Sequence, residues 1–192
     1  MKKRLLLILV GISLVLIVIL AAVLSGDKDS SFSDANPIET YDFGTSADTD
    51  LYLNISHSQL ESAIDDLVQK ELIEADNLPL SYQYANAVVK AFSYEIVDVG
   101  TAGKAELKVT YVDVLKLADS FGDVIDVDAF YSFCIQQIDN KTAPVVEDKI
   151  VVECILTEDN GIIELVDNID LADALTGGAA SEYIKMMEGR EN

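Results

Sequence analysis

The side chains that could carry chemistry in this sequence are few and widely spaced. His57 is the only histidine, and it stands at the start of an expected helix with no second histidine near it to complete a metal site or a catalytic triad. The sequence also holds only two cysteines, Cys134 and Cys154, and no tryptophan. We therefore expect no metal and no cofactor, and we expect His57 to be solvated.

The two cysteines can form one disulfide bond or remain free in the core. Cys134 falls on the apolar stripe of an expected helix, and Cys154 falls on the apolar face of the strand that follows it. An extracytoplasmic location would permit a disulfide. A free cysteine is also at home in an apolar core. The sequence leaves both alternatives open.

Aspartates gather at two places that resemble oxygen-rich calcium sites. Asp123, Asp126 and Asp128 precede an expected helix, and Asp48 and Asp50 lie earlier in the chain. Neither group has the EF-hand spacing with its central glycine and terminal glutamate. Because the helix dipole favours carboxylates at a helix start, we interpret the first group as helix-start charge and expect no metal there.

Composition and charge exclude one large class of function. The chain has 192 residues, with 34 acidic against 13 basic side chains and a net charge of −21. Recognition of nucleic-acid phosphates needs a lysine and arginine surface, which this composition does not supply. We expect no nucleic-acid partner and room for one domain of ordinary size.

The N-terminus has the pattern of a membrane segment. Three basic residues at positions 2–4 precede an apolar run over residues 5–24. At about 1.5 Å per residue, such a helix spans about 30 Å, the thickness of the hydrocarbon core. The basic residues on the N-terminal side favour a cytoplasmic N-terminus. This predicts a single-pass protein of the cell membrane, anchored through residues 5–24, with its C-terminal domain outside the cell.

A cleaved signal peptide is the alternative, with a cleavage site near Val23-Leu24-Ser25. The apolar run is longer than the usual signal core, which favours an uncleaved anchor over residues 1–24. Residues 25–50 are rich in Ser, Asp and Thr and show no apolar period, so they predict a flexible acidic linker. Residues 51–192 form the expected domain.

Apolar periodicity predicts helices and strands in this domain. Ser58 and Glu61 have the spacing of a capping box. Alternating residues on both sides of the segment 100–103 predict a β-hairpin, and Asp159-Asn160-Gly161 predicts a second one. The expected helices cover residues 58–75, a shorter segment from Tyr84 to Ala91, 114–120 after an N-cap at Asp113, 127–138 and 171–176; the expected strands cover 92–99, 104–112, 149–157 and 162–166.

Helices gathered against a curved antiparallel sheet define an α+β fold. The segments Phe92–Ile96, Ala105–Asp113 and Asp173–Gly178 resemble the NTF2-like or cystatin-like domains on membrane-anchored and lipoprotein-type extracytoplasmic proteins of Gram-positive bacteria. The resemblance covers about residues 56–178. It implies a cone-shaped sheet with a pocket, and it carries over no catalytic residue.

Enzymes on the NTF2-like fold work inside the cone, often with an acid and a tyrosine. By this resemblance, Tyr111, Asp113 and Glu153 are the candidate pocket residues, since a carboxylate in an apolar cavity can act as a general base. Strand alternation alone would instead place Glu153 in water. We expect a membrane-anchored extracytoplasmic module that binds a protein or small molecule without catalysis. The alternatives are a small enzyme that uses the cone and a purely structural spacer.

Overall fold

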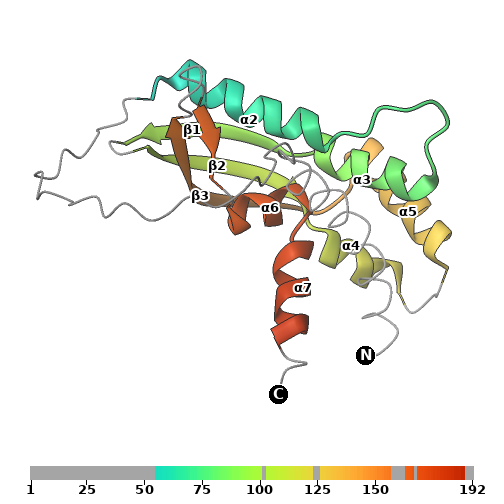
Figure 1. Ribbon diagram of the computed structural model, residues 1–192. Coiled ribbons are helices and arrows are strands. Elements are labelled where there is room, and N and C mark those ends of the chain that lie inside the picture. Colours follow the sequence, from blue (N-terminus) through green and yellow to red (C-terminus); the bar gives the residue numbers. More distant parts are fainter. Residues whose placement is uncertain (1–54, 101–102, 123–125, 157–162, 167, 189–192) are drawn as a thin grey trace, which may run out of the picture.

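A computed structural model describes residues 55–100, 103–122, 126–156, 163–166 and 168–188 (Figure 1). Within these ranges no helix is long and apolar enough to cross a membrane, and the expected anchor at residues 5–24 lies outside them. The elements, in chain order, are α2 (His57–Glu71), α3 (Leu80–Lys90), β1 (Ser93–Val99), β2 (Lys104–Val112), α4 (Val114–Phe121), α5 (Val127–Asp139), β3 (Val145–Leu156), β4 (Ile163–Leu165), α6 (Ile169–Leu175) and α7 (Ala179–Glu188).

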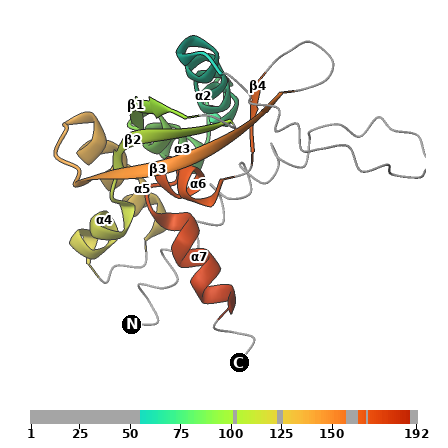
Figure 2. The same cartoon turned by 90° about the vertical axis from the view of Figure 1, so that its left-hand side faces the viewer.

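The strands form an antiparallel sheet in the order β1-β2-β3-β4, in which the short β4 pairs only with the end of β3. This confirms the α+β class. The helix α2 contacts both β1 and β4, the first and last strands of this order. The sheet therefore curves around α2, as the two views show (Figures 1 and 2).

The main core lies between the sheet and the helices α2 and α6. Leu107 and Val109 on β2 are fully buried, as are Leu60 and Ile64 on α2. These residues follow a period of two on the strand and a helical period on α2, so each element presents one apolar face. Burial of these two faces against each other fixes α2 across the sheet.

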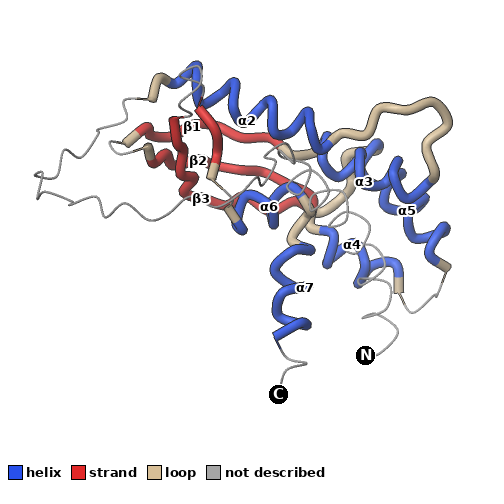
Figure 3. The backbone as a smooth tube through the Cα atoms, in the orientation of Figure 1, coloured by secondary structure: helices blue, strands red, loops and turns tan. Residues whose placement is uncertain are grey.

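A second core joins α3, α4 and α5 beyond one end of the sheet, where the three helices cluster in the tube view (Figure 3). Its centre is aromatic: the rings of Tyr84 and Tyr131 stack with their centroids 4.9 Å apart, and Phe130 packs beside both. Such rings bury a large apolar area in a small volume. This cluster includes Val88 and Ala91, at the end of α3 just before β1 begins.

The start of α2 differs from the expected one. Ser56, rather than Ser58, is the N-cap: the Gln59 amide donates to the Ser56 hydroxyl, and the Ser56 amide donates to the Gln59 side chain. Both serines are followed three residues later by Gln or Glu, so the sequence offered two capping boxes. The structure uses the first, which places His57 inside the first turn.

The end of α2 also differs, because the helix stops at Glu71 and not at Ala75. Asn86 on α3 holds the backbone of Ile73 from both sides: Ile73 N–H donates to Oδ1 at 3.0 Å, and Nδ2 donates to the Ile73 carbonyl at 2.9 Å. A longer helix would need the Ile73 N–H and C=O groups for its own hydrogen bonds, and the Asn86 side chain binds both. Hydrogen bonds from α3 to the segment after α2 thus accompany the end of α2 at a point where the local sequence would allow more turns.

Several other element boundaries lie close to the predicted ones. The start of β3 differs from the prediction, and the helix α7 was not predicted. The hairpin strands β1 and β2 and the Asp113 cap of α4 are confirmed. The strand β3 starts at Val145 rather than Lys149, because its first residues pair with the end of β2. The sequence analysis did not predict α7, which follows Gly177 and Gly178 and projects from the body of the domain (Figures 1 and 2). The predicted turn at residues 159–161 lies outside the described residues.

Candidate functional site

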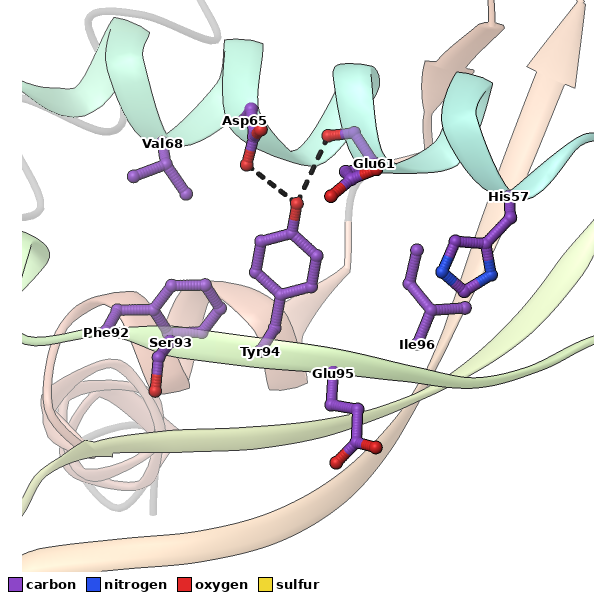
Figure 4. A pocket seen from close by; sticks show the side chains of 9 residues that line it. All are labelled: His57, Glu61, Asp65, Val68, Phe92, Ser93, Tyr94, Glu95 and Ile96. Atoms are coloured by element: carbon purple, nitrogen blue, oxygen red, sulfur yellow. Dashed lines mark hydrogen bonds between the residues drawn. The ribbon is translucent and has the colours of Figure 1, made fainter.

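A groove of about 650 Å³ runs between the first turns of α2 and strand β1 (Figure 4). The lining residues come from two elements far apart in the sequence. They are His57, Glu61, Asp65 and Val68 from α2, Phe92 just before β1, and Ser93, Tyr94, Glu95 and Ile96 from β1. The groove is open, so its lining remains accessible from outside.

The groove follows the edge of the sheet. Among the described strands β1 is the first in the sheet order, so β2 is its partner on one side and, within this part of the chain, the other side is an edge. The side chains of Tyr94 and Ile96 point toward α2, whereas those of Ser93 and Glu95 point away from it (Figure 4). Because lining residues come from both faces of β1, the hollow wraps the strand edge.

Strand pairing shows which backbone groups face this edge. Gly100 N–H donates to the Lys104 carbonyl at 2.9 Å, so the backbone groups of Lys104 point toward β1. In an antiparallel pair this direction alternates along the strand. Lys108 and Thr110 therefore also point at β1, where they oppose Glu95 and Ser93. The backbone groups of Tyr94 and Ile96, which alternate with these, point into the groove.

Tyr94 connects the edge strand to the helix. Its hydroxyl donates to Asp65 Oδ1 at 2.7 Å and lies 3.2 Å from the Glu61 carbonyl oxygen (Figure 4). Partial burial, followed by the hydrogen bond to Asp65, raises the pKa of Tyr94 well above its usual range. The phenol therefore stays protonated at neutral pH and acts as a hydrogen-bond donor, not as a base.

The groove is acidic on both sides and apolar along its floor. Glu61 and Asp65 stand on α2, and Glu95 stands on the outward face of β1. His57 lies at the open end, and none of the residues that line this groove is lysine or arginine. Such a surface attracts cations and repels anions.

The sequence-predicted pocket residues do not meet in one cavity. Glu153 lies on the outer face of the sheet, where it forms a 2.7 Å ion pair with Lys104 and its side chain is 53% exposed. Tyr111 lies on the opposite, covered face of β2. Burial raises the pKa of Tyr111, and the charges of Asp173, Asp148 and Asp113 raise it further.

Asp113 serves a local structural purpose. Its carboxylate accepts a hydrogen bond from the Lys116 amide at 2.9 Å and pairs with the Lys116 ammonium at 2.9 Å, which caps α4. Asp126 caps α5 in the same way through the Ala129 amide. No group of His, Cys, Asp and Glu that could hold a metal ion occurs among the residues that the structure describes. Asp48, Asp50 and Asp123 lie outside them.

The two cysteines are free and buried. Cys134 belongs to the aromatic core of α3, α4 and α5, whereas Cys154 belongs to the core between the sheet and α2. Burial raises the pKa of the Cys134 thiol to about 12 and also raises the pKa of Cys154. Both therefore act as small apolar core residues in this structure.

Sequence reasoning missed the groove, although it noted His57 at the helix start. One signal was available: Glu61 and Asp65 are spaced by four residues, which places both on one side of a helix. The partner of that pair, Tyr94, is 29 residues away from Asp65, and no local pattern connects them.

Comparisons with known proteins found no significant match. None of the protein-family models matches the sequence, no curated protein matches it significantly, and no solved structure matches its fold significantly.

Proposed function

We propose that this chain is a single-pass membrane protein whose extracytoplasmic α+β domain, of the NTF2-like or cystatin-like kind, is a binding module. Residues 5–24 would anchor it, and the linker at 25–50 would hold the domain away from the membrane. The sheet that curves around α2 supports the choice of fold family. The groove between α2 and β1 is the proposed binding surface.

The observation that carries this proposal is the groove along the free edge of β1. It combines an apolar floor, the Tyr94 hydroxyl oxygen, which can accept a hydrogen bond because its proton is donated to Asp65, and backbone groups of Tyr94 and Ile96 at the strand edge. Sites that recognise ligands share this mixture of apolar surface and a few oriented polar groups. The proposal is recognition without catalysis, in which the Tyr94 phenol, hydrogen-bonded to Asp65, helps to orient a ligand and does not react with it.

Site-specific photo-crosslinking in living cells tests the groove. A photoreactive benzophenone side chain would replace Ser93, which lines the groove, in the full-length chain. The matched control would replace Val151, which is 51% exposed on the outer face of β3. Irradiation should give a discrete adduct at position 93 and none at 151, and mass spectrometry should identify its class. Equal labelling at both positions, or no adduct at 93, would overturn the proposed site.

The anchor is tested in the same cells. The intact protein should remain in the membrane fraction, and added protease should remove a C-terminal tag from cells stripped of their wall. Recovery of most of the protein from the medium, with a new N-terminus near Gly26, would show a cleaved signal instead.

A further inference from the structure

The free edge of β1 is regular over a short stretch and irregular beyond it. Residues from Ser93 to Ile96 pair one-to-one with β2, and the register then shifts between Ile96 and Asp98, with Val97 as the extra residue. Bulges twist an edge strand away from further pairing and protect it. The bulge, which discourages pairing with a further strand, thus lies beyond the groove, whereas the regular stretch from Ser93 to Ile96 lines the groove.

An incoming strand would find backbone partners at this stretch. The N–H and C=O groups of Tyr94 and Ile96 face the edge, as the register with β2 requires. Extended peptides bind such edges by main-chain hydrogen bonds, while side-chain pockets give specificity. The groove supplies pockets on both sides of the edge, since its lining includes residues from both faces of β1.

The charged residues around the groove favour an incoming strand with basic side chains. On the outward side, Glu95 faces any side chain placed opposite it. On the α2 side, a long basic side chain can lay its stem on Val68 and Phe92 and reach Asp65 or Glu61 with its charged end. An acidic strand would meet like charges on both sides.

We infer that the groove binds an extended polypeptide segment that carries lysine or arginine side chains and adds to the edge of β1 as a further strand. This inference rests on the proposed function and names the class of ligand for the same groove. The segment belongs to another molecule. The only consecutive basic residues in this chain are at positions 2–4, and the proposed membrane anchor at residues 5–24 separates them from the domain.

Capped seven-residue peptides test the inference with the full-length chain in nanodiscs of neutral phosphatidylcholine. The probe alternates arginine at odd positions with threonine at even positions, and an otherwise identical peptide replaces arginine with glutamate. Two further probes carry N-methyl groups on only the odd or only the even residues. A strand that pairs through one edge uses alternate N–H groups. One methylated peptide should therefore lose at least about tenfold in affinity, and the other should bind as the parent does.

Single substitutions test whether the peptide binds at this groove. The arginines of this probe share one face of the strand, and Asp65 and Glu95 lie on opposite sides of the edge. Asp65→Asn or Glu95→Gln, whichever removes the charge on the face that the arginines occupy, should therefore weaken the arginine peptide by roughly three- to tenfold, and the other should change its affinity little. The matched control Glu153→Gln removes the same charge from the outer face of β3, where Glu153 pairs with Lys104 and neither residue lines the groove, and should leave the affinity unchanged. Circular dichroism would confirm that each variant is folded.

Three results would overturn the inference: equal binding of the two methylated peptides, binding of the glutamate peptide as tight as that of the arginine peptide, or an equal effect of Glu153→Gln. An adduct at Ser93 that proves to be a small molecule would overturn this inference while leaving the groove as a binding site. Absence of any adduct at that position would remove the proposed function itself.

Discussion

The hydroxyl of Tyr94 on β1 donates a 2.7 Å hydrogen bond to the carboxylate of Asp65 on α2. This bond joins the edge strand of the sheet to the helix that crosses it. It also fixes the distance between the two sides of the groove, because the tyrosine side chain spans it (Figure 4). The groove is therefore held at a set width, which would lower the ordering cost of the proposed binding.

Tyr94→Phe should lower the free energy of unfolding by about 1 kcal/mol, since it removes one hydrogen bond to a charged acceptor at a partly exposed site. Urea titration at pH 7 measures this change. A double-mutant cycle with Asp65→Asn should give a coupling energy of about 0.5–1.5 kcal/mol. Additive effects of the two substitutions would show that the bond does not contribute in solution.

Glu71 should destabilise the protein at neutral pH. Its side chain is 4% exposed, one carboxylate oxygen has no hydrogen-bond partner, and burial raises its pKa. The folded state then holds the proton more tightly than the unfolded state, so this group's contribution to stability falls as pH rises through the interval between the unfolded and folded pKa values. Glu71→Gln should therefore stabilise the protein at pH 7 by on the order of 1 kcal/mol.

The difference between Glu71→Gln and the wild type should shrink toward pH 4, where the wild-type carboxyl is increasingly protonated. Urea titrations at pH 4, 5.5 and 7 measure it. Asp66→Asn, an exposed position on the same helix, is the control and should show no such trend. A Glu71→Gln variant that is less stable at pH 7 would indicate that the carboxylate is favourably paired in solution.

Gly177→Ala should cost about 2 kcal/mol or more. Gly177 has φ of +69°, and an added Cβ would overlap Val114 Cγ2 and lie 2.8 Å from the Val112 carbonyl oxygen. Gly178→Ala is a matched control, because its φ is +84° but its nearest neighbour would be 3.9 Å away. The control should lose only about 1–2 kcal/mol from backbone strain. Equal losses in the two variants would show that crowding at Gly177 is relieved.

Both thiols should resist modification in the folded protein. The thiolate is the reactive form, and Cys134, with its pKa raised to about 12, is almost entirely protonated at pH 8. Ellman's reagent should react with neither cysteine in buffer and with both in urea. Intact mass under non-reducing conditions should show two free thiols. A mass lower by two hydrogens would instead establish the disulfide between Cys134 and Cys154.

Features with causes inside a few residues were predictable from the sequence. Period-two alternation defined β1 and β2, and Asp113 capped α4 as expected. The same alternation predicted Glu153 in water, whereas the resemblance to NTF2-like domains suggested a position in a pocket. In the structure Glu153 is exposed and paired with Lys104.

Features that depend on distant contacts were decided only by the tertiary structure. Two capping boxes were available at the start of α2, and Asn86, on another helix, ended it at Glu71. The groove has the same origin. From the local sequence alone, Glu61 and Asp65 are expected on a solvated face of a helix. Tyr94 is one of several aromatic residues in the expected strands. The three residues line one groove because burial of Leu60 and Ile64 sets α2 across the sheet and brings its acidic side to the edge of β1.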